Sequence, residues 1–226
     1  MKVVVLIPAF NEERSIEKVL KEIPRKHVSE VVVIDNNSTD RTAEIAKRNG
    51  AIVLKEPNRG YGSACLTGIK FAQSLNPDVL VFLDADYSDF PEEMSKLLEK
   101  ISQGYDMVIG SRMLGKAAPG SLLPQARWGN RLAVFLIRLF FGYRYTDLGP
   151  FRAIRWQALQ KLHMQDRNFG WTVEMQIKAV KLGLKITEVS VGYRNRIGTS
   201  KITGTVSGTL KAGYKILFTI FKYALK

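Results

Sequence analysis

The stretch V-F-L-D-A-D-Y-S-D, residues 81–89, places three carboxylates directly after an apolar run. Residues 78–83, D-V-L-V-F-L, are apolar after the first position, which predicts a buried strand. Positions i and i+2 of an extended chain point to the same side, so Asp84 and Asp86 are expected to face one point. Two such carboxylates raise each other's pKa unless a cation lies between them. The pattern therefore predicts a divalent-cation site, and the plainer interpretation is a polar loop whose aspartate caps the next helix.

Strand signals alternate with helical spacing through the first half of the chain. Besides 78–83, strands are predicted at 2–7, 30–34, 51–54 and 106–110, and helices at 12–23, 41–49, 62–75 and 91–103. Such alternation is typical of an α/β fold with a mainly parallel central sheet flanked by helices. Ligands of these sheets bind at the carboxyl ends of the strands, and the polar clusters fall there, at 8–12, 35–40, 84–89 and 110–112.

Composition limits the class of protein. The chain has 226 residues, of which 46% are hydrophobic, enough to bury a core without disulfides or metals. Its single cysteine, Cys65, forms no internal disulfide, which fits a reducing compartment. We recognise no secretory signal and no window of about 20 uninterrupted apolar residues, so no transmembrane helix is expected.

The charge is uneven along the chain. Residues 1–110 hold 14 Lys/Arg and 17 Asp/Glu, whereas residues 111–226 hold 20 Lys/Arg and only 4 Asp/Glu. The second half is therefore expected to face an anionic partner: phosphate groups, an acidic membrane surface or nucleic acid. The alternative is a generally basic, well-solvated surface.

The second half is less regular than the first. Residues 113–126 contain several glycines and prolines and are expected to form a mobile loop. Residues 172–182 have helical spacing, 184–191 a strand pattern, and 206–226 are basic and helical. The apolar segment 132–143 is either a buried core helix or a helix at a membrane interface, with nearby arginines reaching headgroups. The lysines of the tail also suit an anionic membrane surface.

Several motifs together resemble family 2 glycosyltransferases, which have the GT-A nucleotide-diphospho-sugar transferase fold. They are P-A-F-N-E (8–12), D-N-N-S-T-D (35–40), N-R-G-Y-G-S-A (58–64) and D-A-D (84–86). T-D-L-G-P-F-R-A-I-R (146–155) resembles the branch of dolichyl-phosphate mannose and glucose synthases. The resemblance implies a catalytic domain over 1–205, with a nucleotide-binding half (1–112) and an acceptor half (113–205). A basic amphipathic C-terminal helix (206–226) follows.

The resemblance also implies roles for residues of the first half. It places Pro8, Ala9, Glu12 and Asp35 around the base and ribose of a nucleotide sugar. It assigns Asp84 and Asp86, with Ala85 between them, to a Mg²⁺ or Mn²⁺ ion and the diphosphate, with Asp86 catalytic. The synthases often carry Gln two residues after D-x-D, and this chain has Ser88 there. The third protein ligand is therefore open between Ser88 and Asp89.

Basic residues are the candidates for binding phosphate. Arg194 and Arg196, two residues apart, should share one face, with Ser200 and Lys201 just beyond. Arginine forks and a lysine suit phosphate oxygens, and in the synthases this region closes over the donor diphosphate or acceptor phosphate. We therefore expect Arg194 to be catalytic. Further candidates are Arg112, on the nucleotide-sugar side, and Arg127, on the acceptor side.

Acidic residues of the second half are the candidates for general base. Asp147, within the T-D-L-G-P-F-R motif, is expected to position the acceptor or take its proton. Glu174 is expected either to bind sugar or to support its loop. His27 and His163 lie in no ligand-like cluster and are interpreted as structural.

These observations and the resemblance predict a metal-dependent glycosyltransferase that moves a hexose from a nucleotide diphosphate sugar to a polyprenyl phosphate. Inversion at the sugar is what the resemblance implies. We expect it to be cytoplasmic and peripheral at the inner membrane face, on the anionic lipid or through a membrane-protein partner. The first alternative is a hydroxyl acceptor such as a soluble glycan, glycerate or lipid. The second, a basic nucleic-acid-binding module, is disfavoured because recognition motifs such as the RRM signature are absent. A Rossmann dehydrogenase is disfavoured because no G-x-G-x-x-G follows the first strand.

Overall fold

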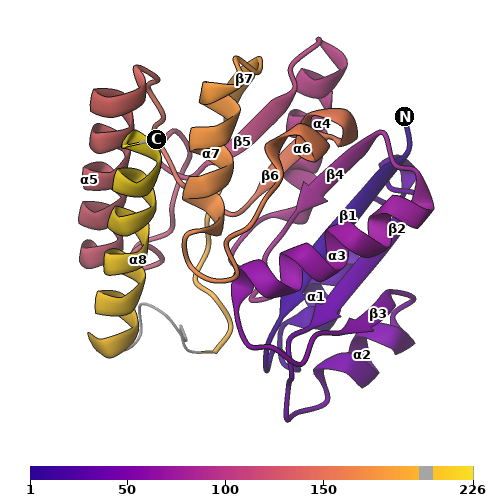
Figure 1. The fold of residues 1–226 in the computed structure, drawn as a ribbon. Coiled ribbons are helices and arrows are strands. Elements are labelled where there is room, and N and C mark those ends of the chain that lie inside the picture. The colour runs from indigo at the N-terminus through magenta and orange to yellow at the C-terminus, as the bar shows by residue number, and fades with distance from the viewer. Residues whose placement is uncertain (199–205, 226) are drawn as a thin grey trace.

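The computed structural model describes residues 1–198 and 206–225. Seven strands form one sheet in the order β3-β2-β1-β4-β6-β5-β7, with helices on both faces (Figure 1). The strands are β1 (Val3–Ala9), β2 (Glu30–Asp35), β3 (Ile52–Lys55), β4 (Val79–Phe82), β5 (Met107–Ser111), β6 (Arg152–Arg155) and β7 (Ile186–Ser190). The expected mainly parallel sheet is confirmed, because only β6 runs antiparallel to its neighbours.

The helices fall into two groups, one for each face of the sheet. One core cluster is formed with α1 (Ile16–Glu22), α2 (Thr42–Arg48) and α4 (Met94–Ser102). The other is formed with α3 (Tyr61–Leu75), α5 (Pro124–Phe141), α6 (Trp156–Leu162), α7 (Trp171–Lys181) and α8 (Val206–Ala224). Two short 3₁₀ helices, η1 (Arg25–His27) and η2 (Pro91–Glu93), complete the elements. Alternate residues of β1 enter the two clusters, as the two-residue repeat of a strand requires.

Strand β6, helix α6 and the short η1 are the elements that the sequence pattern did not predict, and α5 begins at Pro124, inside the segment expected to be a loop. β6 lies between β4 and β5 and pairs with both in antiparallel register. Its four residues, R-A-I-R, begin and end with arginine, so they carry no apolar run. The Arg152 guanidinium is nevertheless buried, because it donates hydrogen bonds to the carbonyl oxygens of Thr172 (3.2 Å) and Leu148 (3.3 Å). These bonds satisfy part of the buried guanidinium, whereas its Nε has no hydrogen-bond partner among the described residues.

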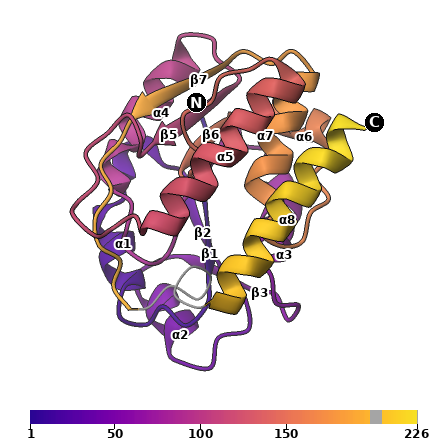
Figure 2. The ribbon, with the colours of Figure 1, turned by 90° about the vertical axis from the view of Figure 1, so that its left-hand side faces the viewer.

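Helices α5 and α8 lie side by side on one flank of the molecule (Figure 2). The Phe140 and Phe221 rings meet edge to face, with centroids 5.6 Å apart. The segment expected to be a mobile loop is tied to the strand-like residues near 193: Ala117 bridges Tyr193, and the Ala118 N–H donates to the Tyr193 carbonyl at 2.7 Å. No helix among the described residues is long and apolar enough to cross a bilayer.

Candidate active site

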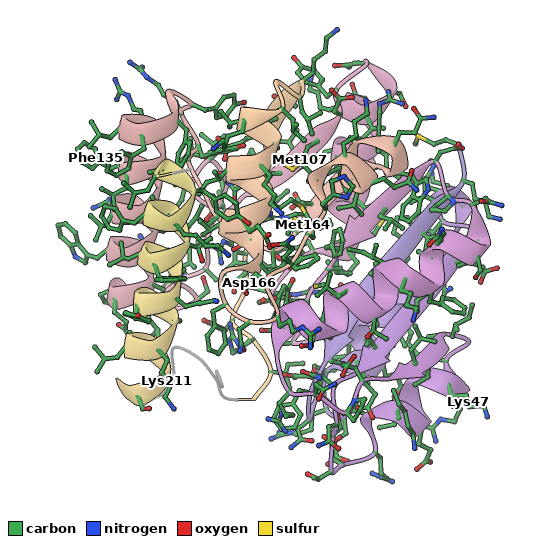
Figure 3. The ribbon with its side chains drawn as sticks, viewed as in Figure 1. Lys47, Met107, Phe135, Met164, Asp166 and Lys211 are labelled. Atoms are coloured by element: carbon green, nitrogen blue, oxygen red, sulfur yellow. The ribbon has the colours of Figure 1, made fainter. Side chains whose placement is uncertain are left out.

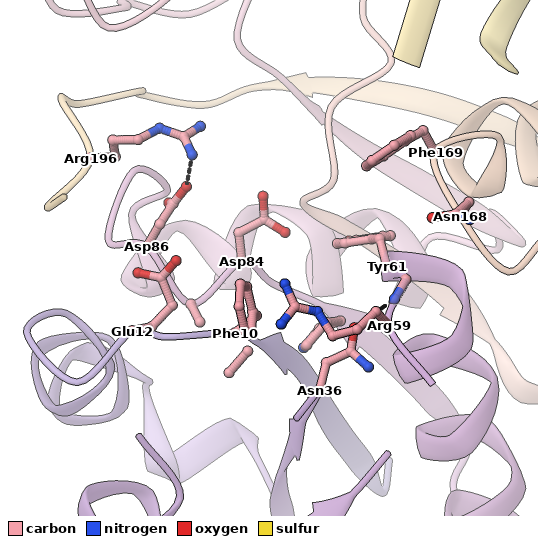
Figure 4. A pocket seen from close by; sticks show the side chains of 14 residues that line it. Phe10, Glu12, Asn36, Arg59, Tyr61, Asp84, Asp86, Asn168, Phe169 and Arg196 are labelled. Atoms are coloured by element: carbon pink, nitrogen blue, oxygen red, sulfur yellow. Dashed lines mark hydrogen bonds and ion pairs between the residues drawn. The ribbon is translucent and has the colours of Figure 1, made fainter. Parts of the chain in front are cut away.

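A pocket of about 280 Å³ opens at the carboxyl ends of β1, β2 and β4 (Figure 4). Its lining comes from segments that are far apart in the sequence. The lining residues are Pro8, Ala9, Phe10, Glu12, Asn36, Arg59, Gly60, Tyr61, Asp84, Ala85, Asp86, Asn168, Phe169 and Arg196. The pocket therefore lies at the edge of the sheet where the strand pattern predicts a ligand site.

Hydrogen bonds fasten the turn after β1 to the loop after β2. Asn11 has a left-handed backbone (φ 53°), and its N–H donates to Ser38 Oγ at 3.0 Å. The Glu12 N–H donates to Thr42 Oγ1 at 2.8 Å. The Glu12 carboxylate lines the pocket and accepts a 2.9 Å bond from Ser15 Oγ. A carboxylate held in this way can accept further hydrogen bonds from ligand hydroxyls.

Two glycines allow the loop before α3 to approach the loop at 165–169. A β carbon at Gly60 or Gly62 would collide with the backbone carbonyl of residue 167 or 166. Gly60 also has a φ of 149°, which side chains of L-residues rarely adopt. Asn36 holds the Gly60 N–H with its Oδ1 at 2.8 Å. This close approach brings Asn168 and Phe169 to the pocket.

Asp84 and Asp86 reach the pocket from a turn. Strand β4 ends at Phe82, and a turn follows at 85–86. Strand alternation was the reason for expecting Asp84 and Asp86 on one side, and that reason is wrong because both residues lie beyond the strand. Both carboxylates still line the one pocket (Figure 4). Burial, followed by the negative charge of Asp86, raises the pKa of Asp84 to about 7. A cation between the two would relieve this repulsion.

Ser88 and Asp89 were the candidates for a third metal contact, and neither lines the pocket. Both are buried. The Ser88 hydroxyl and N–H donate to Asp86 Oδ1 at 2.5 and 2.9 Å. Burial, followed by the charges of Asp84 and Asp86, raises the pKa of Asp89 well above its ordinary value. Ser88 thus orients the Asp86 carboxylate by donating to it.

Arg196 supplies a positive charge directly beside Asp86. Two backbone hydrogen bonds hold residues 194–197 against the turn that contains Asp86. The Arg194 N–H donates to the Ser88 carbonyl and the Ile197 N–H to the Asp86 carbonyl, both at 2.9 Å. Arg196 Nη1 lies 2.8 Å from Asp86 Oδ2 (Figure 4). Its side chain is 31% exposed, so the pair is accessible from the pocket.

A family model for glycosyl transferase family 2 matches residues 4–162, most of the chain, from β1 through α6. The chain belongs to this family. The glycosyltransferase is 34% identical over 212 residues to a dolichyl-phosphate hexose transferase of Haloferax volcanii, covering 90% of this chain and 88% of the relative. It is 31% identical over 228 residues to an undecaprenyl-phosphate mannosyltransferase of Micrococcus luteus, covering 92% and 90%.

The fold of the glycosyltransferase is also found among solved structures. It resembles glucosyl-3-phosphoglycerate synthase from Mycobacterium tuberculosis, solved with Mn²⁺, uridine diphosphate and glucosyl-3-phosphoglycerate. The TM-score is 0.79, with 22% identity over 99% of this chain and 80% of the other. At this identity the likeness establishes the fold, and the expected GT-A fold is confirmed.

Most residues expected to bind the nucleotide sugar meet in the pocket of the glycosyltransferase. They are Pro8, Ala9, Glu12, Asp84, Ala85 and Asp86, joined by Arg196 from the expected phosphate-binding set. Asp35 lies buried at the end of β2, outside the pocket lining, and its Oδ1 accepts the Ser38 N–H at 3.2 Å. Arg127, on α5, donates to the Leu122 carbonyl at 3.3 Å. Ser200 and Lys201 lie outside the described residues.

Arg112 and Asp147 pair with each other away from the pocket lining. Arg112 Nε and Nη2 donate to the two carboxylate oxygens of Asp147 at 2.8 and 2.7 Å, and its N–H donates at 2.9 Å. The Asp147 side chain is 0% exposed. The expectation that Asp147 takes a proton from the acceptor does not fit this geometry, because three donors already occupy its oxygens. Asp147 instead fixes the guanidinium of Arg112.

Arg194 faces away from Arg196 and from the pocket. Its Nη2 lies 2.6 Å from Glu22 Oε2, and its guanidinium stacks over the Tyr87 ring, 3.3 Å from the centroid. Its Nε donates to the Tyr87 carbonyl at 2.7 Å. The expected shared face for the two arginines is therefore wrong, because the backbone pairing with residues 86–88 turns them apart. Arg194 clamps the turn that carries Asp86.

Glu174 supports its loop, which resolves the two alternatives for this residue. Its carboxylate accepts the N–H groups of Gln165 and Asp166, at 3.1 and 2.7 Å, and the Tyr223 hydroxyl at 2.8 Å. Lys178 Nζ pairs with it at 2.7 Å. With these partners, the carboxylate is turned to the 165–169 loop and does not line the pocket.

Several pocket residues were not singled out from the sequence. Phe10 and Arg59 stack, with the guanidinium carbon 3.1 Å from the ring centroid. Burial and then the negative charge of Asp84 raise the pKa of Tyr61 well above its ordinary value. Phe10, Arg59 and Tyr61 lie inside quoted motifs, so their place could have been inferred from their neighbours. Asn168 and Phe169 carried no such signal, because only the folded glycine contact brings them here.

Proposed function

We propose that this enzyme transfers a hexosyl group, with inversion, from a nucleotide diphosphate sugar to a polyprenyl phosphate, using Mg²⁺ or Mn²⁺. One observation carries the proposal: Asp84, Asp86 and Arg196 meet in a single pocket at the ends of parallel strands. A diphosphate with its divalent cation presents both signs of charge, and this pocket offers a partner for each. The relatives named for dolichyl and undecaprenyl phosphates, aligned over 90% and 92% of this chain, support the acceptor class.

Asp84 and Asp86 are the residues proposed to hold the metal. The site fits a cation because burial and the neighbouring charge hold the pKa of Asp84 at about 7, and a bound divalent ion would lower that pKa. Within residues 1–198 and 206–225, no group of three or more His, Cys, Asp or Glu side chains is arranged for a metal. Phosphate oxygens and water would therefore complete the coordination, as is typical of Mg²⁺. When bound, the ion would neutralise charge developing on the leaving diphosphate.

The remaining pocket residues are proposed to hold the nucleoside. Pro8, Ala9 and Glu12 would line the base and ribose, and Glu12 has carboxylate oxygens to accept ribose hydroxyls. The stacked Phe10–Arg59 pair offers a flat surface for a base. Asp35, beneath the turn after β2, is proposed to reach the base.

A phosphate acceptor suits the chemistry of the site. It is an anion at neutral pH and attacks without losing a proton to a base, whereas a hydroxyl acceptor needs one. The carboxylate expected to serve as that base, Asp147, is buried and paired with Arg112. Arg196 is proposed to leave Asp86 and to bind the departing diphosphate instead. Arg127, Ser200 and Lys201 are proposed to contact the acceptor phosphate.

The proposed acceptor also implies where in the cell the enzyme works. A polyprenyl phosphate lies in a bilayer, so we propose a peripheral position at the cytoplasmic face of a membrane. The 20 Lys/Arg against 4 Asp/Glu of residues 111–226 favour an anionic surface there.

The test is transfer of label from a radioactive nucleotide sugar, with Mn²⁺, to polyprenyl phosphate in detergent or to glycerate in buffer. Organic-phase product that Asp86→Asn fails to make supports the proposal. Product in the aqueous phase alone would establish the hydroxyl-acceptor alternative. Thermal-shift screening of nucleotide diphosphates with and without Mn²⁺ identifies the donor base, because a ligand that binds the folded state raises Tm.

A further inference from the structure

The outer face of α5 is apolar over three turns. Trp128, Leu132, Phe135 and Leu139 follow one another at helical spacing and are 69, 48, 59 and 63% exposed. They lie opposite the buried face of the helix, so they project away from the protein; Figure 3 shows Phe135 doing so. Such a row is far more apolar than the scattered exposed residues of an ordinary surface.

The outer face of α8 repeats this pattern beside it. Its exposed apolar residues are Leu210, Tyr214, Phe218 and Phe221, at 68, 71, 47 and 44% exposure, and Leu225, just beyond the end of the helix, is 88% exposed. They lie opposite residues of α8 that are buried against the rest of the protein, such as Ile220. Because α5 and α8 pack together (Figure 2), the two rows form one surface, which we call the α5–α8 face.

The charged residues of α5 and α8 are all positive, and several of them border the α5–α8 face. Arg131 and Arg138 flank the apolar row of α5, and Lys211 and Lys222 flank that of α8; all four are exposed. The sequences of α5 and α8 contain no Asp or Glu. Apolar side chains bordered by Arg and Lys match a headgroup layer of anionic lipid above acyl chains.

We infer that the α5–α8 face is the surface by which the enzyme lies on an anionic bilayer. The apolar rows enter the boundary between headgroups and acyl chains, and the four cations bind lipid phosphates. This inference rests on the proposed function for its purpose, because it brings the enzyme to a lipid-borne acceptor. A second copy of this chain is a poorer occupant, because it would set cation against cation across an apolar contact.

The test is binding of the full chain to vesicles without donor, acceptor or metal, so it does not depend on transferase activity. Vesicles of 70% phosphatidylcholine and 30% phosphatidylglycerol are compared with pure phosphatidylcholine, by co-sedimentation and Trp128 fluorescence. We expect at least about tenfold stronger binding to the anionic vesicles, weakened by salt, and a blue shift absent in Trp128→Phe.

Two variants make the test specific to the α5–α8 face. Leu132→Glu/Leu139→Glu should lose at least about tenfold in vesicle binding while keeping the circular dichroism of the wild type. Leu114→Glu is the matched control, since Leu114 is 52% exposed outside both helices, and it should bind as wild type does. Three outcomes would each overturn the inference. They are wild-type protein that does not bind anionic vesicles, equal vesicle binding by the double variant, and a wild-type dimer that only the double variant abolishes. Vesicle binding without any lipid-linked product would instead count against the proposed function.

Discussion

Two arginine–carboxylate pairs flank the centre of this enzyme, and they differ in exposure and geometry. Arg112 and Asp147 form a two-pronged pair in which Asp147 is 0% exposed. Arg196 and Asp86 meet through one contact of 2.8 Å, and Arg196 is 31% exposed in the pocket. Arg112 and Asp147 are therefore suited to a permanent structural contact. Arg196, in contrast, can leave Asp86 for another anion. The chemical type of an ion pair therefore says little about its role, and its burial and partners decide that role.

The largest effect is expected from breaking the buried pair. Asp147→Asn leaves the Arg112 charge in a buried site without its counter-charge, which costs about 3–5 kcal/mol of unfolding free energy. Urea denaturation followed by circular dichroism measures this loss. Arg112→Met/Asp147→Leu is the matched control, and it should recover most of the stability. An Asp147→Asn protein as stable as wild type would contradict the assignment of this pair as structural.

The pocket carboxylate should behave in the opposite way. Asp86→Asn is expected to lower kcat by at least about 10²-fold, as for loss of a major charge-stabilising group. Its stability should change little, because the carbonyl oxygen of the introduced amide can still accept from Ser88 and the repulsion with Asp84 is removed. Steady-state kinetics and thermal unfolding on the same preparation separate the two effects. Near-normal turnover would remove Asp86 from the proposed metal site.

Arg196 tests whether the exposed pair is exchangeable. Arg196→Ala should lower turnover by about 10- to 100-fold if the guanidinium stabilises the leaving diphosphate. The same change should strengthen Mn²⁺ binding in the absence of nucleotide, because the charge competing for Asp86 is gone. Isothermal titration calorimetry with MnCl₂ measures the second effect. Weaker Mn²⁺ binding by Arg196→Ala would refute the exchange.

The last prediction concerns pH and the metal-free protein. The pKa of Asp84 is raised from 3.8 to about 7 by burial and then by Asp86, so the folded state binds a proton more tightly than the unfolded state. Stability from this group is therefore fully present below about pH 4 and is lost as pH rises through about 7. Tm in EDTA should fall over that window more steeply for wild type than for Asp84→Asn. Equal slopes in the two proteins would show that Asp84 titrates normally.

Much of the fold follows from local pattern, and the exceptions have physical causes. The strands ending at Asp35 and Phe82 are apolar runs followed by polar residues, which period and composition reveal. Strand β1 was also predicted, but it continues through Pro8 to Ala9. Strand β6 was not predicted, because Arg152 acquires its carbonyl partners only when the chain is folded. A strand of four residues with charged ends gives no alternation to detect.

The location of the site in the fold could be predicted from the sequence, but the pairing of its charged side chains could not. Sequence order puts Glu12, Asp84 and Asp86 at one edge of a parallel sheet, and the pocket lies there. Spacing also suggested that Arg194 accompanies Arg196, yet the partner of each guanidinium depends on tertiary neighbours. Glu22 and Tyr87, which hold Arg194, come from α1 and from the turn after β4. No local pattern specifies such a contact.

The contacts of α8 with the 165–169 loop have a consequence of their own. Lys215 pairs with Asp166 at 2.9 Å, and Tyr223 donates to Glu174, which holds the same loop from the other side. Asn168 and Phe169 of this loop form part of the pocket wall. A displacement of α8 would therefore be passed through Lys215 and Tyr223 to this wall of the pocket. If α8 binds a surface, thermodynamic reciprocity would then require a pocket ligand and that surface to change each other's affinity by the same factor.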